Sequence, residues 1–435
     1  MKIALVSSAT DPAGRNIHRH IHALLETGTY TRPGREYQHI VVDGRLIFED
    51  GIDRNLDADL IIFLSRHASV NPVPVLTVHV TGNFSGAELG GVKGSLAPAA
   101  PAWMHAVLRN LELYRPPGYG AMYEVTHHGP TEISTPSFFV EIGSTDHEWT
   151  DEGAGASVAR SVLMAEPSST IPLIGFGGTH YAKRETEIAL KSQGAFGHIA
   201  HTREVPGLTP AMVLQMAGKT GAVAAYIDRN ALDGKTLAGI EKMVESAGIP
   251  CLRGQEITDL GSLPWTDYLR IRDLAQSEVP GGSLHIHSVD RMEKPVVVCI
   301  NPDLISAAFN AGGSQFVAAL EKIPLAHLST PSRPVIPRVI ADESKAEEIL
   351  YDLITLCVSN ITVNEETAFE EDQLIIRKKK MDPRKARELG VPAGPLFGLL
   401  MRGETVQVGE REITPDMVQV SSRKAIHIPG LERYT

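Results

Sequence analysis

Short apolar runs alternate with longer segments of helical spacing through about the first 250 residues of the chain. Residues 2–8 and 59–64 are apolar runs of strand length, and Asp11-Pro12 supplies the cap and first-turn proline of a helix that continues to about Glu26. This alternation indicates an α/β fold with a mixed, mostly parallel sheet flanked by helices. It predicts further strands at 37–42, 75–80, 121–126, 137–143, 171–176, 196–200, 223–226 and 250–252, and helices at 101–114, 151–166, 180–193, 209–219 and 234–247.

The composition changes near residues 253–265, where we place a domain boundary. Beyond it the pattern predicts strands at 284–287 and 296–300, helices at 316–323 and 345–358, and a β-like tail from Thr405. We therefore expect a first domain over 1–257 that carries the chemistry and a smaller α+β C-terminal extension over 266–435.

Composition limits the classes of protein to consider. The chain has 435 residues, of which 43% are hydrophobic and 21% charged, values typical of a globular protein. No apolar run reaches 18 residues and the first residues lack a signal-peptide pattern, so we expect no membrane segment. The three cysteines, Cys251, Cys299 and Cys357, are far apart, which excludes a disulfide framework and a Cys-rich zinc site. This fits a reducing cytoplasm, and we expect a cytoplasmic monomer.

The formal charge of −11 does not favour general binding to nucleic acid. A local basic segment remains, formed by Arg377-Lys378-Lys379-Lys380 together with Arg384, Lys385 and Arg387. It is either a solvated run of charge or a contact for RNA, and the sequence leaves both open.

Polar residues and glycines gather directly after the predicted strands. In open α/β sheets, ligands bind outside the carboxyl ends of the strands, so these residues outline one pocket if most strands are parallel. They include Asp11, Asn16, Ser65-Arg66-His67, His79, Thr81-Gly82-Asn83, His127-His128, the loop 175–180 and His198.

Two features of this set constrain the structure: a glutamate that needs a charged partner, and a pair of histidines that needs a break in its strand. Glu141 lies within the apolar run Phe138-Phe139-Val140-Glu141-Ile142, where a buried carboxylate needs a cation, a metal or a proton. Arg66 is one possible partner, and a functional role is the alternative. His127 and His128 would point to opposite faces of a regular strand, so both serve one site only if Gly129-Pro130 ends that strand.

The glycine loop at 175–178 matches neither GxGxxG nor the Walker pattern, which gives little support to a nucleotide cofactor. Its backbone N–H groups could approach a phosphate or an oxyanion. The chain also has no GxSxG elbow and no HExxH motif. The remaining chemistry is that of a site rich in His and Glu, which suits either a metal-activated water or a histidine general base.

At these residues the sequence resembles the archaeal and plant type of D-aminoacyl-tRNA deacylase. The resemblance runs over about residues 1–255 and implies a zinc-dependent enzyme that hydrolyses the ester between a D-amino acid and the 3′-terminal ribose of tRNA. It also implies a core similar to peptidyl-tRNA hydrolases and nucleoside phosphorylases. Six stretches carry it in family order, namely 65–69, 77–83, 126–132, 136–149, 175–182 and 195–199.

A second, local likeness lies in the tail. Residues 389–400 are similar to a stretch of the tRNA 3′-end processing ribonucleases of the metallo-β-lactamase type, but the metal-binding HxHxDH motif of that family is absent. His285-Ile286-His287 has only the first spacing of that motif. No second nuclease site is therefore implied. The likeness fits either a tail that contacts tRNA or a stable packed corner, and of these two we expect the packed corner.

We predict that His128, Glu141 and His180 act in catalysis on this reading. Zn²⁺ would be held by His127, His128, Glu141 and His180, with His79 and His198 as alternates. We predict that the substrate, D-aminoacyl-tRNA, contacts Arg66, His67, Asn83, Gly177 and Gly178. Two rival functions remain: a peptidyl-tRNA hydrolase or other zinc hydrolase on the same scaffold, and a tRNA-binding protein without catalysis.

Overall fold

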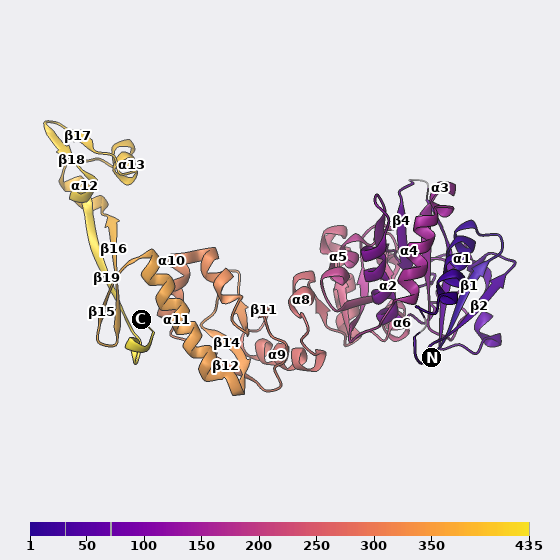
Figure 1. The fold of residues 1–435 in the computed structure, drawn as a ribbon. Helices are drawn as coiled ribbons and strands as arrows, with labels where there is room; N and C mark the ends of the chain where they lie inside the picture. The colour runs from indigo at the N-terminus through magenta and orange to yellow at the C-terminus, as the bar shows by residue number, and fades with distance from the viewer. Residues whose placement is uncertain (31, 70–71, 435) are drawn as a thin grey trace. The chain divides into compact units, whose positions relative to one another are not determined.

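The computed structural model describes residues 1–30, 32–69 and 72–434, which form two compact units, Met1–Gly261 and Ser262–Thr435 (Figure 1). Each unit has its own sheets and its own hydrophobic core. Among the described residues, no helix combines the length and the apolar composition needed to cross a bilayer.

The first sheet of unit 1 has six strands in the order β2-β1-β3-β6-β4-β5, and all neighbours are parallel except β4 and β6. A mixed, mostly parallel sheet is what the alternation of strands and helices predicted. Helix α1 lies close to this sheet because Gly14 has no side chain: a Cβ there would be 2.5 Å from the carbonyl oxygen of Leu64. The elements are β1 (Lys2–Ser8), α1 (Pro12–Glu26), β2 (Glu36–Val42), β3 (Leu60–Ala68), β4 (Val75–His79), α2 (Pro101–Tyr114), β5 (Gly120–Tyr123), β6 (Ser137–Ser144), α3 (Asp146–Trp149) and α4 (Glu152–Leu163).

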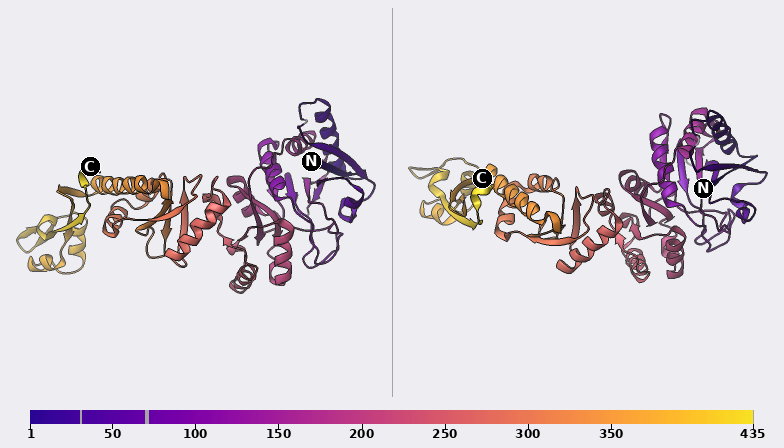
Figure 2. Two further views of the ribbon diagram at one scale, coloured as in Figure 1. Left: turned by 90° about the horizontal axis from the view of Figure 1, so that it is seen from below. Right: turned by 60° about the horizontal axis from the view of Figure 1, so that its bottom comes forward.

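The second half of unit 1 forms a separate sheet of four parallel strands, in the order β10-β9-β7-β8. The sequence pattern did not predict this division into two sheets. Helices α6 and α7 pack on this sheet around a core that includes Val213, Ile240 and Val244. Figure 2 shows the ribbon of unit 1 from two further sides, with helices beside its strands. The elements are β7 (Ile171–Phe176), α5 (Lys183–Lys191), β8 (Gly194–Ala200), α6 (Pro210–Thr220), β9 (Ala224–Ile227), α7 (Gly234–Ser246), β10 (Cys251–Leu252) and α8 (Gly254–Asp259).

Two predicted boundaries in unit 1 are wrong for one shared reason. The strand expected at 121–126 ends at Tyr123, and the helix expected at 180–193 begins only at Lys183. Glu124 and Tyr181 form an isolated β-bridge, and Val125 N donates a hydrogen bond to His180 O at 3.0 Å. This long-range pairing holds both segments outside regular strand and helix.

Unit 2 contains antiparallel sheets, as expected for a smaller α+β extension. A four-stranded sheet, β11-β13-β14-β12, is joined to helices α10 and α11 by a core that includes Leu304, Phe316 and Leu353. A three-stranded sheet, β15-β16-β19, follows it. The elements are α9 (Trp265–Glu278), β11 (Ser283–His287), β12 (Pro295–Cys299), α10 (Pro302–Leu320), β13 (Leu325–Ser329), β14 (Arg338–Asp342), α11 (Ala346–Asn364), β15 (Glu366–Glu370), β16 (Gln373–Met381), α12 (Pro383–Glu388), α13 (Pro395–Met401), β17 (Val406–Val408), β18 (Arg411–Ile413) and β19 (Gln419–His427).

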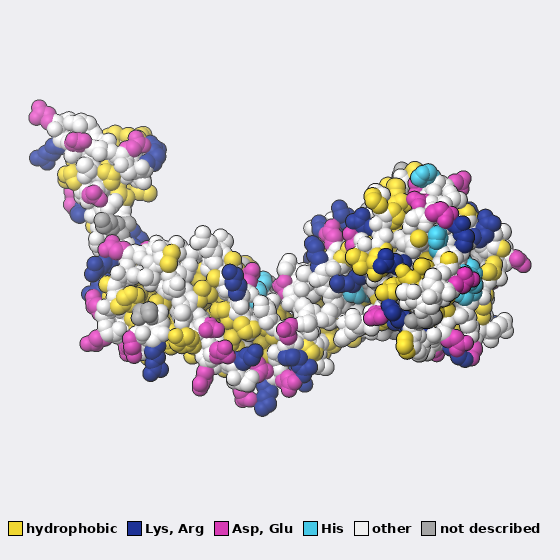
Figure 3. All heavy atoms as spheres, in the orientation of Figure 1, with side chains coloured by type: hydrophobic (Ala, Val, Ile, Leu, Met, Phe, Trp, Pro, Cys, Tyr) yellow, Lys and Arg dark blue, Asp and Glu magenta, His cyan; other side chains and the backbone are white. Residues whose placement is uncertain are grey.

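The tail stretch 389–400 belongs to a small apolar cluster in which Val391 and Leu400 pack with Val406, Ile413 and Val418. This is the packed corner that we expected for it. Acidic and basic side chains are interspersed on the face of the molecule in Figure 3, so the net charge of −11 is not gathered in one patch there.

Candidate active site

A hollow of about 430 Å³ opens in unit 1 at the carboxyl ends of β1 and β3; we call it the histidine hollow. The four residues that the sequence predicted as metal ligands, His127, His128, Glu141 and His180, all line it. The other lining residues are Ser8, Thr10, Asp11, Arg45, Leu46, Ile47, Ser65, Arg66, His67, Ala68, Leu89, Phe139 and Trp149.

Pairing of strands brings Glu141 to this hollow. Glu141 is in the middle of β6, opposite Ser65 of β3, and its side chain is buried. The hydroxyl of Ser65 donates a hydrogen bond to Glu141 Oε1 at 2.5 Å, and His67 Nδ1 lies 3.5 Å from Oε2. The pairing of Glu141 with Arg66 is wrong, because Arg66 projects from the opposite face of β3 and places its guanidinium over the Trp149 ring at 5.1 Å.

His127 and His128 reach the same hollow because they follow the end of β5 rather than continue it. The backbone of His128 is left-handed, with φ of +47°, so the alternation of a strand no longer applies. His79, at the end of β4, is fully buried and does not line the hollow, but its Nε2 lies 3.2 Å from His128 Nε2. The break before Gly129-Pro130 that the two histidines required is therefore present.

Glu124 is the centre of the site, and the sequence reading missed it. Its side chain is fully buried, and ring nitrogens of four histidines surround it. The distances to its carboxylate oxygens are 3.0 Å from His67 Nδ1, 3.1 Å from His180 Nε2, 3.6 Å from His127 Nε2 and 3.8 Å from His79 Nδ1. The signal was present, because Glu124 interrupts the apolar run 121–125 as Glu141 interrupts its own run.

Burial and neighbouring charges divide the histidines of the site into neutral and charged ones. Burial lowers the pKa of His127 to about 4 and holds the pKa of His79 and His128 well below the usual value, so these imidazoles are neutral. Burial also disfavours the charged form of His67, but Glu124 and Glu141 outweigh it and raise the pKa of His67 to about 11.

The same two effects give the carboxyl groups of Glu124 and Glu141 different pKa values. Burial favours the protonated form of Glu124, yet the rings of His180 and His67 hold its pKa well below the usual range. Burial, together with the charge of Glu124, raises the pKa of Glu141 to about 7 although His67 opposes the shift. A buried carboxylate whose pKa is near 7 is suited to exchange a proton at neutral pH.

The donor set fits a metal ion. Three groups of side chains at this site have ligand atoms within 4.8 Å of one another: His79, His127 and His128; His67, Glu124 and His180; and His79, Glu124 and Glu141. Both carboxylate oxygens of Glu124 and Nδ1 of His79 are buried and lie outside hydrogen-bond geometry. The charged His67 ring, 3.0 Å from Glu124 Oε1, balances the charge of this carboxylate in part, and a metal ion would satisfy the remaining ligand atoms. Neutral imidazole and carboxylate are ligands that zinc takes in catalytic sites.

Tyr181 was not predicted and orients His67. Its hydroxyl lies 3.1 Å from His67 Nε2, while Nδ1 of the same ring faces the two carboxylates. Such a contact fixes the orientation of the imidazole, as outer partners of metal-site histidines commonly do.

The remaining predicted residues lie beside the hollow rather than in its lining. Asn83 lines an adjoining hollow of about 310 Å³, which His127 and His128 also line, and its amide donates to Gly90 O at 2.8 Å. Gly177 and Gly178 have positive φ angles of 106° and 89°, which let the chain turn from β7 toward His180. His198 is buried against Ala97 O at 2.9 Å and lines neither of these hollows.

Comparison with known proteins gives one consistent family. The family model described as D-aminoacyl-tRNA deacylase matches residues 54–252, a range that contains all the histidines around Glu124. Two relatives described as D-aminoacyl-tRNA deacylase, from Methanoculleus marisnigri and Methanoregula boonei, are 49% and 50% identical to this chain over 436 residues, with 100% of each chain covered.

Shorter proteins match as well. A relative of the same description from Methanosarcina mazei is 36% identical and pairs 94% of its own length with 59% of this chain. A solved structure described as a conserved protein of unknown function is 33% identical, with a TM-score of 0.54, and covers 59% of this chain and 96% of its own.

Proposed function

This chain belongs to the D-aminoacyl-tRNA deacylase family, and we propose that its hydrolysis of D-aminoacyl-tRNA takes place in the histidine hollow with the help of a zinc ion. The reaction cleaves the ester of the D-amino acid to give the free amino acid and tRNA. The observation that carries the proposed location is Glu124, a buried carboxylate whose two oxygens face the ring nitrogens of four imidazoles.

His79, His127 and His128 are the residues that would hold the ion, with Glu124 directly beside them. Their neutral nitrogens are free to donate electron pairs, and His127 and His128 were already among the predicted ligands. When bound, zinc would supply Lewis acidity, which lowers the pKa of the attacking water to about 7.

The chain's own residues do the rest of the work in this mechanism. Glu141 accepts the proton of the attacking water, because its pKa is near 7 and Ser65 fixes its orientation. His180 is the most exposed ring around Glu124, with 40% of its side chain accessible. It therefore lies where its protonated ring can donate a proton to the departing ribose oxygen and become neutral, and Glu124, 3.1 Å away, would stabilise the imidazolium before that transfer.

Substrate positioning falls to residues at the rim. Arg66, whose guanidinium stacks on Trp149, can face a phosphate near the 3′ end of the tRNA. His67 supplies a fixed positive charge beside the ester. We infer indirect roles for Asn83, Gly177 and Gly178, which shape the loops that carry the histidines, and a structural role for His198.

A deacylation assay tests the proposal. D-tyrosyl-tRNA, L-tyrosyl-tRNA and N-blocked peptidyl-tRNA should be compared with and without a chelator, together with the zinc content of the purified protein. We expect hydrolysis of the D-ester alone and its loss on chelation. Hydrolysis of the peptidyl ester would favour the hydrolase rival, and tRNA binding without turnover would favour the non-catalytic one.

Three finer expectations belong with this proposal. We propose that unit 1 is the catalytic domain, that its core is similar to peptidyl-tRNA hydrolases and nucleoside phosphorylases, and that the protein acts as a cytoplasmic monomer. Structural superposition, sedimentation and cell fractionation test these points.

A further inference from the structure

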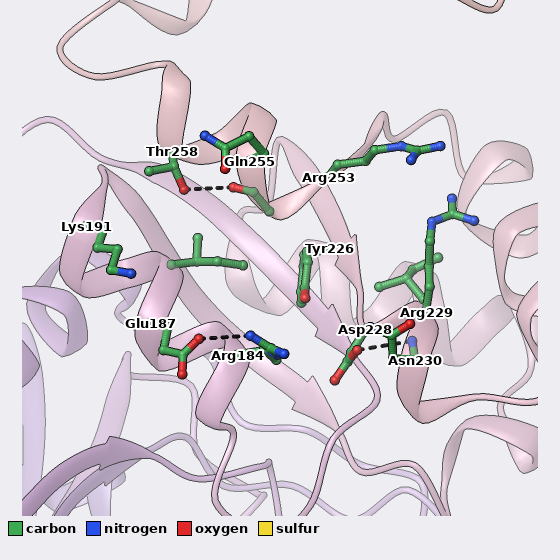
Figure 4. A pocket seen from close by; sticks show the side chains of 13 residues that line it. Arg184, Glu187, Lys191, Tyr226, Asp228, Arg229, Asn230, Arg253, Gln255 and Thr258 are labelled. Carbon is green, nitrogen blue, oxygen red and sulfur yellow. Dashed lines mark hydrogen bonds and ion pairs between the residues drawn. The ribbon is translucent and has the colours of Figure 1, made fainter. Parts of the chain in front are cut away.

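A second hollow, of about 470 Å³, lies in unit 1 away from the histidines, and four cationic side chains line it (Figure 4). We call it the arginine hollow. Arg184 and Lys191 come from α5, Arg229 follows β9, and Arg253 follows β10. The only acidic lining residues described are Glu187 and Asp228, which leaves a formal charge of +2 in a chain whose total is −11. Ile188, Tyr226, Ile227, Asn230, Gly254, Gln255 and Thr258 complete the lining.

The position of the arginine hollow in the topology is that of a ligand site. It lies at the carboxyl ends of β9 and β10, in a sheet whose four strands are all parallel. Ligands of open parallel sheets bind outside these ends. The neighbouring strand β7 leads through 177–182 to His180, so the segment that follows this strand contributes a residue to the histidine hollow.

Helix α5 links the two hollows directly. His180, which lines the histidine hollow, precedes α5, and Arg184 is in its first turn. Lys191 is at the other end of this nine-residue helix. The two cations are seven positions apart, which puts them on one face of the helix with about 10 Å between their Cα atoms.

The cations of the arginine hollow are available to an anion. Arg184 Nη1 lies 3.1 Å from Glu187 Oε2, and Arg229 pairs with Glu241, but both pairs are exposed and such pairs contribute little. Lys191 and Arg253 are exposed and form no ion pair with any residue that the structure describes. In Figure 4, Arg229 and Arg253 lie on one side of Tyr226, and Arg184 and Lys191 lie on the other.

We propose that the arginine hollow binds the phosphodiester backbone of the tRNA substrate close to its 3′ end while the ester occupies the histidine hollow. The inference rests on the proposed place of the reaction. The cations come from three segments and are spread over more than the width of one phosphate, which fits a run of backbone phosphates better than a single small anion. Arginine recognises phosphate through paired hydrogen bonds, and a local positive patch is needed because the chain as a whole repels RNA.

Substitution of the two unpaired cations tests this site. In K191Q/R253Q we expect KM for D-tyrosyl-tRNA to rise about tenfold at moderate salt with kcat unchanged. The slope of log(kcat/KM) against log[salt] should become shallower by about 0.7 for each lost contact to a single strand. The matched control is K183Q/K235Q, which removes two exposed lysines outside the hollow, one of them on the same helix α5.

A minimal substrate separates this site from the chemistry. An ester of D-tyrosine with adenosine has no phosphate, so K191Q/R253Q should hydrolyse it at the wild-type rate. The proposal would be overturned if K191Q/R253Q kept the wild-type KM and salt slope on tRNA. It would also be overturned if the variant lost as much kcat/KM on the minimal ester as on tRNA. The hollow would be assigned to a small anion instead by two results together. Inorganic phosphate or a mononucleotide would raise the Tm of wild type but not of K191Q/R253Q, and the kinetics of the variant on tRNA would be unaltered. A different result would show that the proposed reaction site is wrong: variants of the histidine hollow would then hydrolyse the minimal ester at the normal rate.

Discussion

Each unit of the molecule contains a group of neighbouring histidines, and the two groups differ in one respect. In unit 2, His285, His287 and His327 stack on adjacent strands, His287 Nε2 lies 2.8 Å from His327 Nδ1, and His285 Nε2 lies 2.9 Å from Ser329 Oγ. Burial lowers the pKa of His327 to about 3. In unit 1 the imidazoles surround Glu124, whose oxygens accept no hydrogen bond.

The comparison indicates which feature distinguishes the proposed reaction site from the other group of histidines. Clustered imidazoles can satisfy one another, as they do in unit 2, and then need no ligand. A buried carboxylate is costly unless cations face it. The charged His67 supplies one for Glu124, and the three other imidazoles around it leave ligand atoms for a metal ion.

The substitution E124Q should have the largest effect. It keeps the shape of the side chain but removes the charge that the four histidines share, so we expect kcat/KM to fall about a thousandfold and zinc affinity to fall with it. A single-turnover assay and metal analysis measure both. As the matched change in unit 2, H287Q should leave the activity within about twofold of wild type. Equal activity of E124Q and wild type would remove Glu124 from the chemistry.

Removal of the metal should come next. Dialysis against a chelator should abolish most of the activity, and added Zn²⁺ should restore it. Zinc could also bind outside the histidine hollow, because the ligand atoms of His18, His22 and His39 lie within 4.8 Å of one another. Metal content should therefore be measured in H22A as well as in wild type. A chelated protein that keeps full activity would favour a histidine mechanism without metal.

The pH dependence of stability gives a third, smaller effect, in the metal-free protein. The pKa of His67 is about 11 in the folded chain against about 6.5 when unfolded, so its contribution is fully present below pH 6.5 and is lost as pH rises toward 11. We expect the Tm of wild type to exceed that of H67Q at pH 6.5, and this difference to narrow steadily by pH 10. A difference independent of pH would show that His67 is not held in its charged form.

The sequence predicted the ingredients of the site better than their geometry. A carboxylate inside an apolar run is a reliable sign of a constrained group, and it identified Glu141 correctly as buried. The same sign at Glu124 was lost in an expected regular strand, because only the distant segment at Tyr181 ends that strand. The alternation of apolar runs likewise predicted α/β structure, but the division into two sheets depends on pairings such as β3 with β6, whose residues are about 76 positions apart.

The same limit explains the elements missed in unit 2. The segment 373–381 contains Arg377-Lys378-Lys379-Lys380 and was read only as a run of charge, although it is the central strand β16. Its first half supplies the buried Leu374, Ile375 and Ile376. Local composition therefore hid a strand that its two neighbours, β15 and β19, stabilise from both sides.

The charged residues of β16 allow the test with the smallest expected effect. It asks whether unit 2, like unit 1, contacts the tRNA. Arg377 faces Glu366 and Lys378 pairs with Glu365, both on or next to the adjacent strand β15, which makes them ordinary surface pairs. We expect R377Q/K378Q to change stability by about 1 kcal/mol or less and to leave KM and its salt dependence unaltered. The same two assays on K191Q/R253Q should show a clear effect. If R377Q/K378Q instead weakens binding of tRNA, the basic segment is the RNA contact that the sequence left open, and unit 2 has a share in substrate recognition.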